Sequence, residues 1–475
     1  MPVQTPHPQY TAKAPLWQRC RDVFAGQDAV KARRTDYLPK PGGMDEPTYE
    51  AYLRRAVFFN GLRPTVEGFL GLVFRHAPEV NVPATIAPHL DDITLDDTPL
   101  LDFAVRQFAE LLVVSRTGVL LDFSEVRNRP YWVPYRAEQI LSWRVGRVRD
   151  AMTLTRVVLQ ETVEEPDPKD PWVPRQVDQL RVLLLEPDGE TWAYRVEVYR
   201  QARHADGKAT GDYVLQPDLS GQPTRRGATL DFIPFVVVGP DGMESHAVDP
   251  VLLDLVNVNL SQYQNAADLE HGRHMTGAPT PVVSGVPDTG EQELRIGSTT
   301  AWLLPQGADA KFLEFTGQGL GALEKAIEEK DKKMAALGAR LLSNDGPRQE
   351  TAEAVRLRHS GEHARLRTIA TSATLALSAV LRWHLWWASA VDAVDAADAT
   401  ITFATEYIET KLSPEEAKTL LLKWQSGAIS HRTYYALLER GGLTRKGVTF
   451  EQELAEMASE TPDDGGAMGE REPAA

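Results

Sequence analysis

The period of the hydrophobic pattern changes twice along this chain, and this change constrains the fold more than any other feature. Up to residue 112 the apolar residues recur mainly at helical spacing, three or four positions apart. From residue 118 to about 243 the period is two, in runs rich in Val, Leu, Tyr and Trp. Helical spacing returns from residue 249. The sequence therefore predicts an α+β fold in which strands and helices are segregated.

The strand-like runs follow one another at short spacing with no helix between them. Examples are "YWVPYRAEQILSWRV" and "QLRVLLLEPDGETWAYRVEVYRQ". The second run contains Pro187-Asp188-Gly189, a turn signal, because Pro fixes φ and Gly accepts a positive φ. Strands joined in this way form an antiparallel sheet rather than βαβ units.

Helices are expected on both sides of the sheet. Two are predicted within residues 44–75, and a third follows a proline-rich acidic connector at 76–99. After the sheet, Asp249-Pro250 starts a helix that becomes polar almost all round in "SQYQNAADLEHGRHM". A strand-rich insert at 276–316 then leads into a second amphipathic helix.

The last third of the chain is also mainly helical. Residues 350–387 read as one helix, which at 1.5 Å per residue would be ~55 Å long. A lone strand, "ITFATEYIET", and a pair of helices follow it. From residue 451 onward acids dominate, with Pro and Gly among them, and this segment is predicted to be a disordered tail.

Composition excludes several classes of protein. The formal net charge of −16 makes the chain a poor candidate for binding nucleic acid tightly through its phosphates. The same charge is compatible with a surface along which DNA moves without being bound. The single cysteine, Cys20, excludes an intrachain disulfide framework and any multi-cysteine metal site. No apolar run approaches a membrane span and no secretory signal is visible, so we expect a soluble protein made inside the cell.

A glycine motif is the most specific candidate for cofactor chemistry. Gly317, Gly319 and Ala322 have the spacing by which a dinucleotide's pyrophosphate is held at a helix N-terminus. However, the preceding run "AKFLEF" alternates, with Lys311 and Glu314 on one side, whereas the first strand of such a fold is buried on both faces. No further strand–helix alternation follows it. We therefore expect neither NAD nor ATP to bind.

The remaining candidate residues point to structure rather than catalysis. His271 and His274 beside Glu270 have metal-ligand spacing, but no third ligand suggests itself, so a solvated polar helix end is favoured. The tryptophans that end the long helix could stack on bases, yet core or subunit interface is the commoner role. No catalytic constellation stands out, and we do not expect an enzyme.

The order of these parts resembles the portal protein of tailed bacteriophages, and in detail a portal family often known only as a domain of unknown function. The resemblance covers residues 37–445. It is found in "YEAYLRRAVFFNGLRPTVEGFLGLVF", "LLVVSRTGVLLDF", the helix–insert–helix of 249–342, and "ITFATEYIETKLSPEEAKTLLLKWQSGAISHRT".

The resemblance implies a division of the chain into named parts. These are an N-terminal helical part of the wing (1–112), an antiparallel β wing (113–247), a first stem helix (248–274), a small α/β clip (275–318), a second stem helix (319–342), a channel loop with a long kinked helix (343–390), a wing return strand (391–412), crown helices (413–450) and the acidic tail (451–475).

The resemblance also implies a function. Such chains form a ring, expected to be twelve-fold, at one vertex of the capsid, and double-stranded DNA passes through it non-specifically during packaging and ejection. The expected partners are other copies of the chain, the large terminase, the major capsid protein and head–tail adaptor or neck proteins. No cofactor, metal or membrane is implied. The expected location is the virion, and the bacterial host cytoplasm during assembly.

Three groups of residues acquire roles from this resemblance. The polar loop after the second stem helix would face the channel, with Asn344, Asp345, Gly346 and Arg348. Cations of the second stem helix would line the channel, namely Lys330, Lys332, Lys333 and Arg340. The turn from the clip into that helix would need the small residues Gly317, Gly319 and Gly321.

Two other interpretations remain open. One is a helical scaffold or adaptor that oligomerises through its long helices. The other, less favoured, is a nucleotide-binding enzyme that uses Gly317 and Gly319. Neighbouring genes for a large terminase subunit and a major capsid protein would separate all three.

Overall fold

The computed structural model describes residues 2–166, 170, 172–189, 191–203, 209–277, 280–285, 304, 306–313, 317, 319–338, 352–389, 391–405, 414–440, 443–444, 448 and 450–460. The chain divides into two compact units, Met1–Thr405 and Glu406–Ala475. The fold is α+β, as the sequence predicts.

The first unit begins with helices. They are α1 (Pro8–Ala25), α2 (Gln27–Ala32), α3 (Glu46–Arg55), α4 (Leu62–Val73) and α5 (Leu100–Val114), with a short 3₁₀ turn η1 (Arg34–Asp36) after α2. Helix α3 starts where the Asp45 side chain accepts a hydrogen bond from the Thr48 amide, an N-cap. Helix α5 ends at Ser115, which has a left-handed φ of 60°. The two helices expected within 44–75 and the one after the connector are confirmed.

The connector at 76–99 contains more structure than its composition indicates. It includes strand β1 (Glu79–Asn81) and the 3₁₀ helix η2 (Ala87–Asp91). Strand β1 pairs antiparallel with β14 (Thr400–Thr402). A strand is therefore present at the start of the expected segment, and its partner lies more than three hundred residues earlier in the chain. Residues 406–410 of that expected strand lie outside the described residues.

Two antiparallel sheets occupy the middle of the unit, which confirms the predicted strand block. The first has the order β11-β2-β3 and the second the order β4-β5-β6-β7-β8. Their bounds are β2 (Thr117–Ser124), β3 (Arg129–Arg136), β4 (Ile140–Val148), β5 (Ala151–Pro166), β6 (Pro174–Asp188), β7 (Thr191–Arg203), β8 (Ala209–Leu215) and β11 (Phe235–Val238). Strands β9 (Thr224–Arg225) and β10 (Ala228–Thr229) form a small separate pair. Gly189, with a φ of +63°, makes the predicted turn between β6 and β7.

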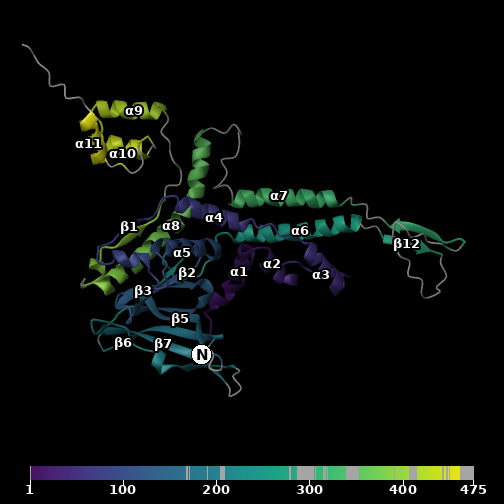
Figure 1. Cartoon of the computed structure of the whole chain (residues 1–475), viewed down its shortest axis with the longest axis horizontal. Helices are drawn as coiled ribbons and strands as arrows, with labels where there is room; N and C mark the ends of the chain where they lie inside the picture. The colour runs from purple at the N-terminus through teal and green to yellow at the C-terminus, as the bar shows by residue number, and fades with distance from the viewer. Residues whose placement is uncertain are drawn as a thin grey trace, which may run out of the picture. The chain divides into compact units, whose positions relative to one another are not determined.

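Helix α8 (Ala352–Ala388) is the long helix expected from the sequence, at 37 residues. It packs against the β11-β2-β3 sheet, β14 and α5 (Figure 1). Alanines such as Ala370, Ala373 and Ala376 are buried along it, so the helix backbone lies close to its neighbours. Ser378 accepts a hydrogen bond from the Ile401 amide and donates one to the Ile401 carbonyl, which fixes β14 on the helix.

Helices α6 (Leu253–Gly277) and α7 (Leu320–Gly338) lie side by side, as Figure 1 shows. Between them in sequence is an antiparallel pair, β12 (Thr280–Ser284) with β13 (Asp309–Leu313). This pair is the part of the expected clip that falls among the described residues. Within the described parts of the chain, no helix combines the length and apolar character that a membrane span requires.

The second unit contains three helices among its described residues, α9 (Pro414–Gln425), α10 (His431–Arg440) and α11 (Phe450–Glu460). The prediction of a disordered tail from residue 451 is wrong for its first ten residues, which belong to α11. Phe450 packs on the rings of His431 and Tyr435, with centroids 5.2 and 5.5 Å apart. Glu451 and Glu453 lie in the first turn of α11, where negative charge stabilises the positive end of the helix dipole. The acidic composition of this segment is therefore compatible with a helix.

Candidate functional site

The candidate site is the pair α6 and α7 with the segments that hold it, because most of the described residues singled out by the sequence lie there. One face of α6 packs on α1, α3 and α4. At its centre Asn259 is fully buried. Its amide oxygen accepts from the Gly61 amide at 2.9 Å, and its amide nitrogen donates to the Phe59 carbonyl at 2.7 Å. This one side chain therefore joins α6 to the loop between α3 and α4.

The polar second half of α6 also has partners within the chain. Tyr263 is buried, with its ring edge-on to Phe58 at 5.7 Å. The Tyr52 hydroxyl donates to Asp268 at 2.6 Å. Burial and that carboxylate raise the pKa of Tyr52, which keeps it a neutral donor. Part of this polar half is therefore held by contacts within the chain.

Helix α7 rests on α6 through both apolar and polar contacts. Met334 is buried close to Gly61. Arg273 of α6 pairs with Glu324 of α7 at 2.9 Å and with its own helix neighbour Glu270 at 2.8 Å. These contacts fix the two helices in register along their length.

The cations of α7 separate into two kinds. The Lys330 ammonium donates to the Ser261 carbonyl of α6 at 2.9 Å, and burial followed by the Lys333 charge lowers its pKa. Lys330 is thus held against α6. Lys332 and Lys333 are exposed, on a surface that also carries exposed glutamates. Burial and then Glu328 raise the pKa of Asp331 on the same helix. The exposed surface of α7 is therefore charged with both signs.

The three glycines around the start of α7 have different roles. Gly317 has a left-handed φ of +67°, and its carbonyl accepts from the Leu320 amide at 2.9 Å, so it makes the turn into the helix. A Cβ at Gly319 or Gly321 would meet no atom of the described residues within 4 Å. The strand before them, β13, pairs antiparallel with β12 rather than in a parallel sheet. Gly317 is therefore a conformational residue at the end of a hairpin.

The other predicted channel residues fall where the structure gives no description. Asn344, Asp345, Gly346, Arg348 and Arg340 lie outside the described residues. Their assignment to a channel stays a prediction.

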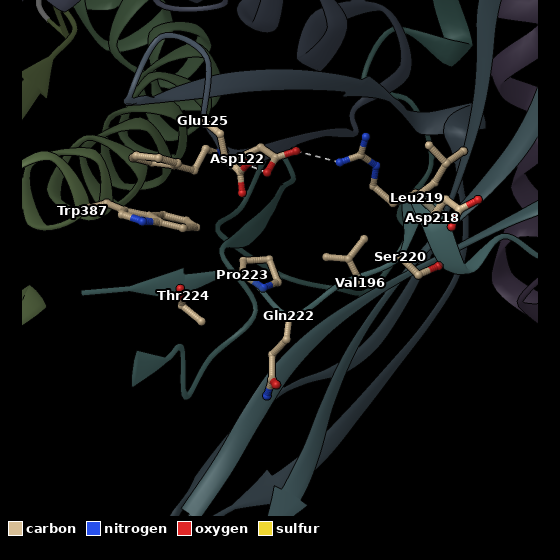
Figure 2. Close-up of a pocket in the computed structure, with 13 residues that line it drawn as sticks. Asp122, Glu125, Val196, Asp218, Leu219, Ser220, Gln222, Pro223, Thr224 and Trp387 are labelled. Atoms are coloured by element: carbon tan, nitrogen blue, oxygen red, sulfur yellow. Dashed lines mark hydrogen bonds and ion pairs between the residues drawn. The ribbon is translucent and has the colours of Figure 1, made fainter. Parts of the chain in front are cut away.

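A pocket of about 500 Å³ lies between the two sheets and the end of α8. Figure 2 shows Asp122 and Glu125 on one side of it, and Asp218 and Ser220 on another. Trp387, at the end of α8, is stacked on Phe123 with centroids 5.7 Å apart. The tryptophans that end the long helix thus pack against the sheet layer, in agreement with a core role.

Three polar side chains of this pocket, Arg181, Asp122 and Ser220, make hydrogen bonds or ion pairs within the chain. Arg181 donates to Asp122 at 2.7 Å, and its Nε lies 2.9 Å from a Glu161 oxygen. The Ser220 hydroxyl donates to the Gln216 carbonyl at 2.7 Å and accepts from the Val198 amide at 3.0 Å. No histidine, cysteine or lysine is among the lining residues. The arrangement therefore offers no activated nucleophile.

The histidine pair on α6 is a polar helix end with intrachain contacts. His271 lies edge-on to Tyr52 and 3.3 Å from an Arg55 nitrogen. Burial, followed by the Arg55 charge, lowers the pKa of His271. Among the described residues, no group of three or more potential ligands could hold a metal ion.

Sequence reasoning overlooked the residues that anchor α6. Asn259 occupies a position in the same periodic row as the buried Leu255, Val256 and Tyr263. A polar amide in such a row is the available signal, because a buried amide needs hydrogen-bond partners. The partners themselves, Gly61 and Phe59, lie about two hundred residues earlier and have no local signature.

Residues 251–388 match the model of a family described as Domain of unknown function (DUF4055). This range extends from just before α6 to the end of α8, and so contains the whole candidate pair. The match agrees with the sequence resemblance, which was to a portal family known by such a description. No curated protein matches the chain.

Several solved structures are similar to the chain. One comes from the virion of a native gene transfer agent (GTA) particle, with 13% identity, a TM-score of 0.38, and coverage of 87% of this chain and 98% of that one. A second comes from the neck of an empty GTA particle with C6 symmetry, with 12% identity, a TM-score of 0.37, and coverage of 89% and 100%. A third, from the neck of a native GTA particle with C12 symmetry, has 13% identity, a TM-score of 0.36, and coverage of 86% and 98%.

Proposed function

We propose that this chain is the portal protein of a tailed-phage-like particle and has no catalytic activity of its own. Copies of it form a closed ring, twelve-fold in the capsid, through which double-stranded DNA is packaged and ejected. The ring sits at one capsid vertex and docks the large terminase, the major capsid protein and neck or adaptor proteins. It assembles in the host cytoplasm and remains in the virion.

The observation that carries this proposal is the α6–α7 pair closed by the β12–β13 strands. Helix α6 is anchored on α1, α3 and α4, whereas α7 contacts the rest of the first unit mainly through α6. The outer surface of α7 is exposed and charged. A pair of helices held in this way suits a stem that stands beside identical stems around an axis.

Exposed apolar side chains near the base of the pair support a ring. Phe59 is 59% exposed, although its carbonyl is held by Asn259, and Val57 in the same loop is 56% exposed. Leu337, one turn beyond Met334 on α7, is 46% exposed. Exposed apolar side chains that gather into one patch are typical of a surface that another protein covers. A heterologous contact between copies that closes on itself gives cyclic symmetry.

The first test is the oligomeric state of the purified full-length chain. Native mass spectrometry and negative-stain electron microscopy are expected to show closed rings, with copy numbers other than twelve allowed outside the capsid. Phe59→Asp should shift the population strongly toward monomer, because a carboxylate would be buried at the contact. Val126→Asp, at a side chain that is 95% exposed on a hairpin tip, is the matched control and should leave rings intact. A monomer or two-fold dimer of the unmutated chain at high concentration would contradict the proposal.

The exposed cations of α7 give a test of the channel itself. Lys332→Glu combined with Lys333→Glu should leave ring assembly unchanged and reduce DNA packaging, because the stem surface then repels phosphates. The charge-conserving pair Lys332→Arg and Lys333→Arg should package normally. Packaged DNA per particle is the measurement. Normal packaging by the glutamate pair would remove these lysines from the channel, whereas failed assembly would place them at a subunit contact.

A further inference from the structure

The β5–β6 hairpin extends well beyond the five-stranded sheet. Strand β5 is 16 residues long, but β4 pairs only with residues 151–159 of it. Strand β7 pairs with β6 only from Gln179 onward. Residues 162–166 and 174–178 therefore form a ribbon of two strands, paired with each other alone. Such a ribbon is marginally stable in water unless something packs on it, and within the chain only its Val177 is buried among the described residues.

The end of this ribbon combines an exposed aromatic ring with unpaired carboxylates. Trp172 is 92% exposed and Val173 is 49% exposed. The Asp170 side chain accepts a hydrogen bond from the Trp172 amide at 3.1 Å, and the Asp170 carbonyl accepts one from the Val173 amide at 3.0 Å. Neither Asp170 nor the exposed Glu164 has a cationic partner among the described residues. We call Glu164, Asp170, Trp172 and Val173 the ribbon tip.

The opposite end of β5, together with β4 beside it, carries exposed positive charge and exposed apolar side chains. Arg144 of β4 and Arg156 of β5 are directly opposite each other, and both are exposed. Neither has a carboxylate partner in the part of the chain that the structure describes. Like charges in this position destabilise a strand pair. Met152, 70% exposed, and Val145, 37% exposed, lie on the same strands. We call Arg144, Val145, Met152 and Arg156 the arginine strip.

The two surfaces cannot meet within one copy. From Leu154 to Pro166 a strand rises ~40 Å at about 3.3 Å per residue, so the strip and the tip are at far ends of one strand. The ribbon tip has carboxylates beside Trp172, and the arginine strip has arginines beside Met152. The two surfaces are therefore opposite in charge, and each has an apolar side chain that the other can cover. Surfaces that match in this way at opposite ends of a chain give a heterologous, head-to-tail contact, the type from which rings are built.

We propose that the ribbon tip of one copy docks on the arginine strip of the next copy, with Trp172 against Met152 and the carboxylates beside Arg144 and Arg156. The contact rests on the proposed ring, and it assigns the ring a specific contact in its sheet region. It removes the repulsion between the two arginines and covers the exposed tryptophan at the same time.

Site-directed cross-linking of the full-length chain tests this contact. The chain's single cysteine is buried, and burial raises its pKa to about 12, so Cys20 does not compete for a thiol reagent. The double variant Trp172→Cys/Met152→Cys, treated with a short bis-maleimide, is expected to give a ladder of covalent oligomers up to the ring. Each single variant should give no ladder. Val126→Cys/Met152→Cys, which also combines two exposed positions, is the control and should give none.

A second measurement separates this contact from ring formation in general. Trp172→Ala should raise the concentration at which half of the chain is assembled by about tenfold or more, as for a buried aromatic anchor. Rings in native mass spectrometry with no ladder from the double variant would overturn the contact and leave the proposed function intact. Absence of any ring would overturn both.

Discussion

Replacing Arg181 by methionine is expected to lower the free energy of unfolding by about 3–5 kcal/mol, the usual loss when one partner of a buried ion pair is removed. Its guanidinium lies between Asp122 of β2 and Glu161 of β5, and all three side chains are mostly buried. The Tyr135 hydroxyl donates to Glu161, and Gln179 donates to the same carboxylate at 2.7 Å. Arg181 is therefore the cation of a network that joins the two sheets.

The variant leaves two carboxylates close together with no counter-charge, which is the physical source of the loss. Urea unfolding of the full-length chain, followed by tryptophan fluorescence, measures it. Arg195→Met is the matched control on the neighbouring strand, because Arg195 pairs with Glu186 at 2.8 Å but its side chain is 47% exposed. An exposed pair of this kind contributes about 1 kcal/mol or less. Equal losses in the two variants would contradict the role given to the buried network.

Replacing Asn259 by alanine is expected to lower the free energy of unfolding by about 2–6 kcal/mol, because it leaves the Gly61 amide and the Phe59 carbonyl without partners, each at ~1–3 kcal/mol. The loss has a second consequence. The loop between α3 and α4 carries the exposed Phe59, so loosening it should also weaken ring assembly.

Asn257→Ala is the control for this variant, since Asn257 is on the same helix, is exposed, and accepts one hydrogen bond from Arg19. It should cost about 1 kcal/mol or less, as for a single exposed hydrogen bond. Unfolding of the first unit and the yield of rings are the two readouts. If Asn259→Ala unfolds at the same urea concentration as the unmutated chain, the α6 anchor lies elsewhere.

Much of the fold follows from the spacing of residues alone. The helices within 44–75, the antiparallel strand block and the long helix α8 have periods of 3.6 or 2 that only one type of element satisfies. The turn at Gly189 follows from the conformational freedom of glycine, and the turn at Gly317 from the same property. These signals are local, because backbone geometry fixes the side-chain period within a few residues.

What the sequence did not indicate depends on partners that are distant along the chain. Strand β1 forms only because β14 supplies hydrogen bonds from residues 400–402. The acidic segment at 451–460 is helical because Phe450 has rings of α10 to pack on. The two arginines of the arginine strip become opposite neighbours through the register of β4 and β5. In the sequence, Asn259 and Arg181 do not differ from other polar residues; their importance comes from burial, which requires each to have polar partners. The sequence by itself determined which elements form, whereas only the tertiary structure decided which polar groups are buried together, since burial depends on contacts that no local pattern records.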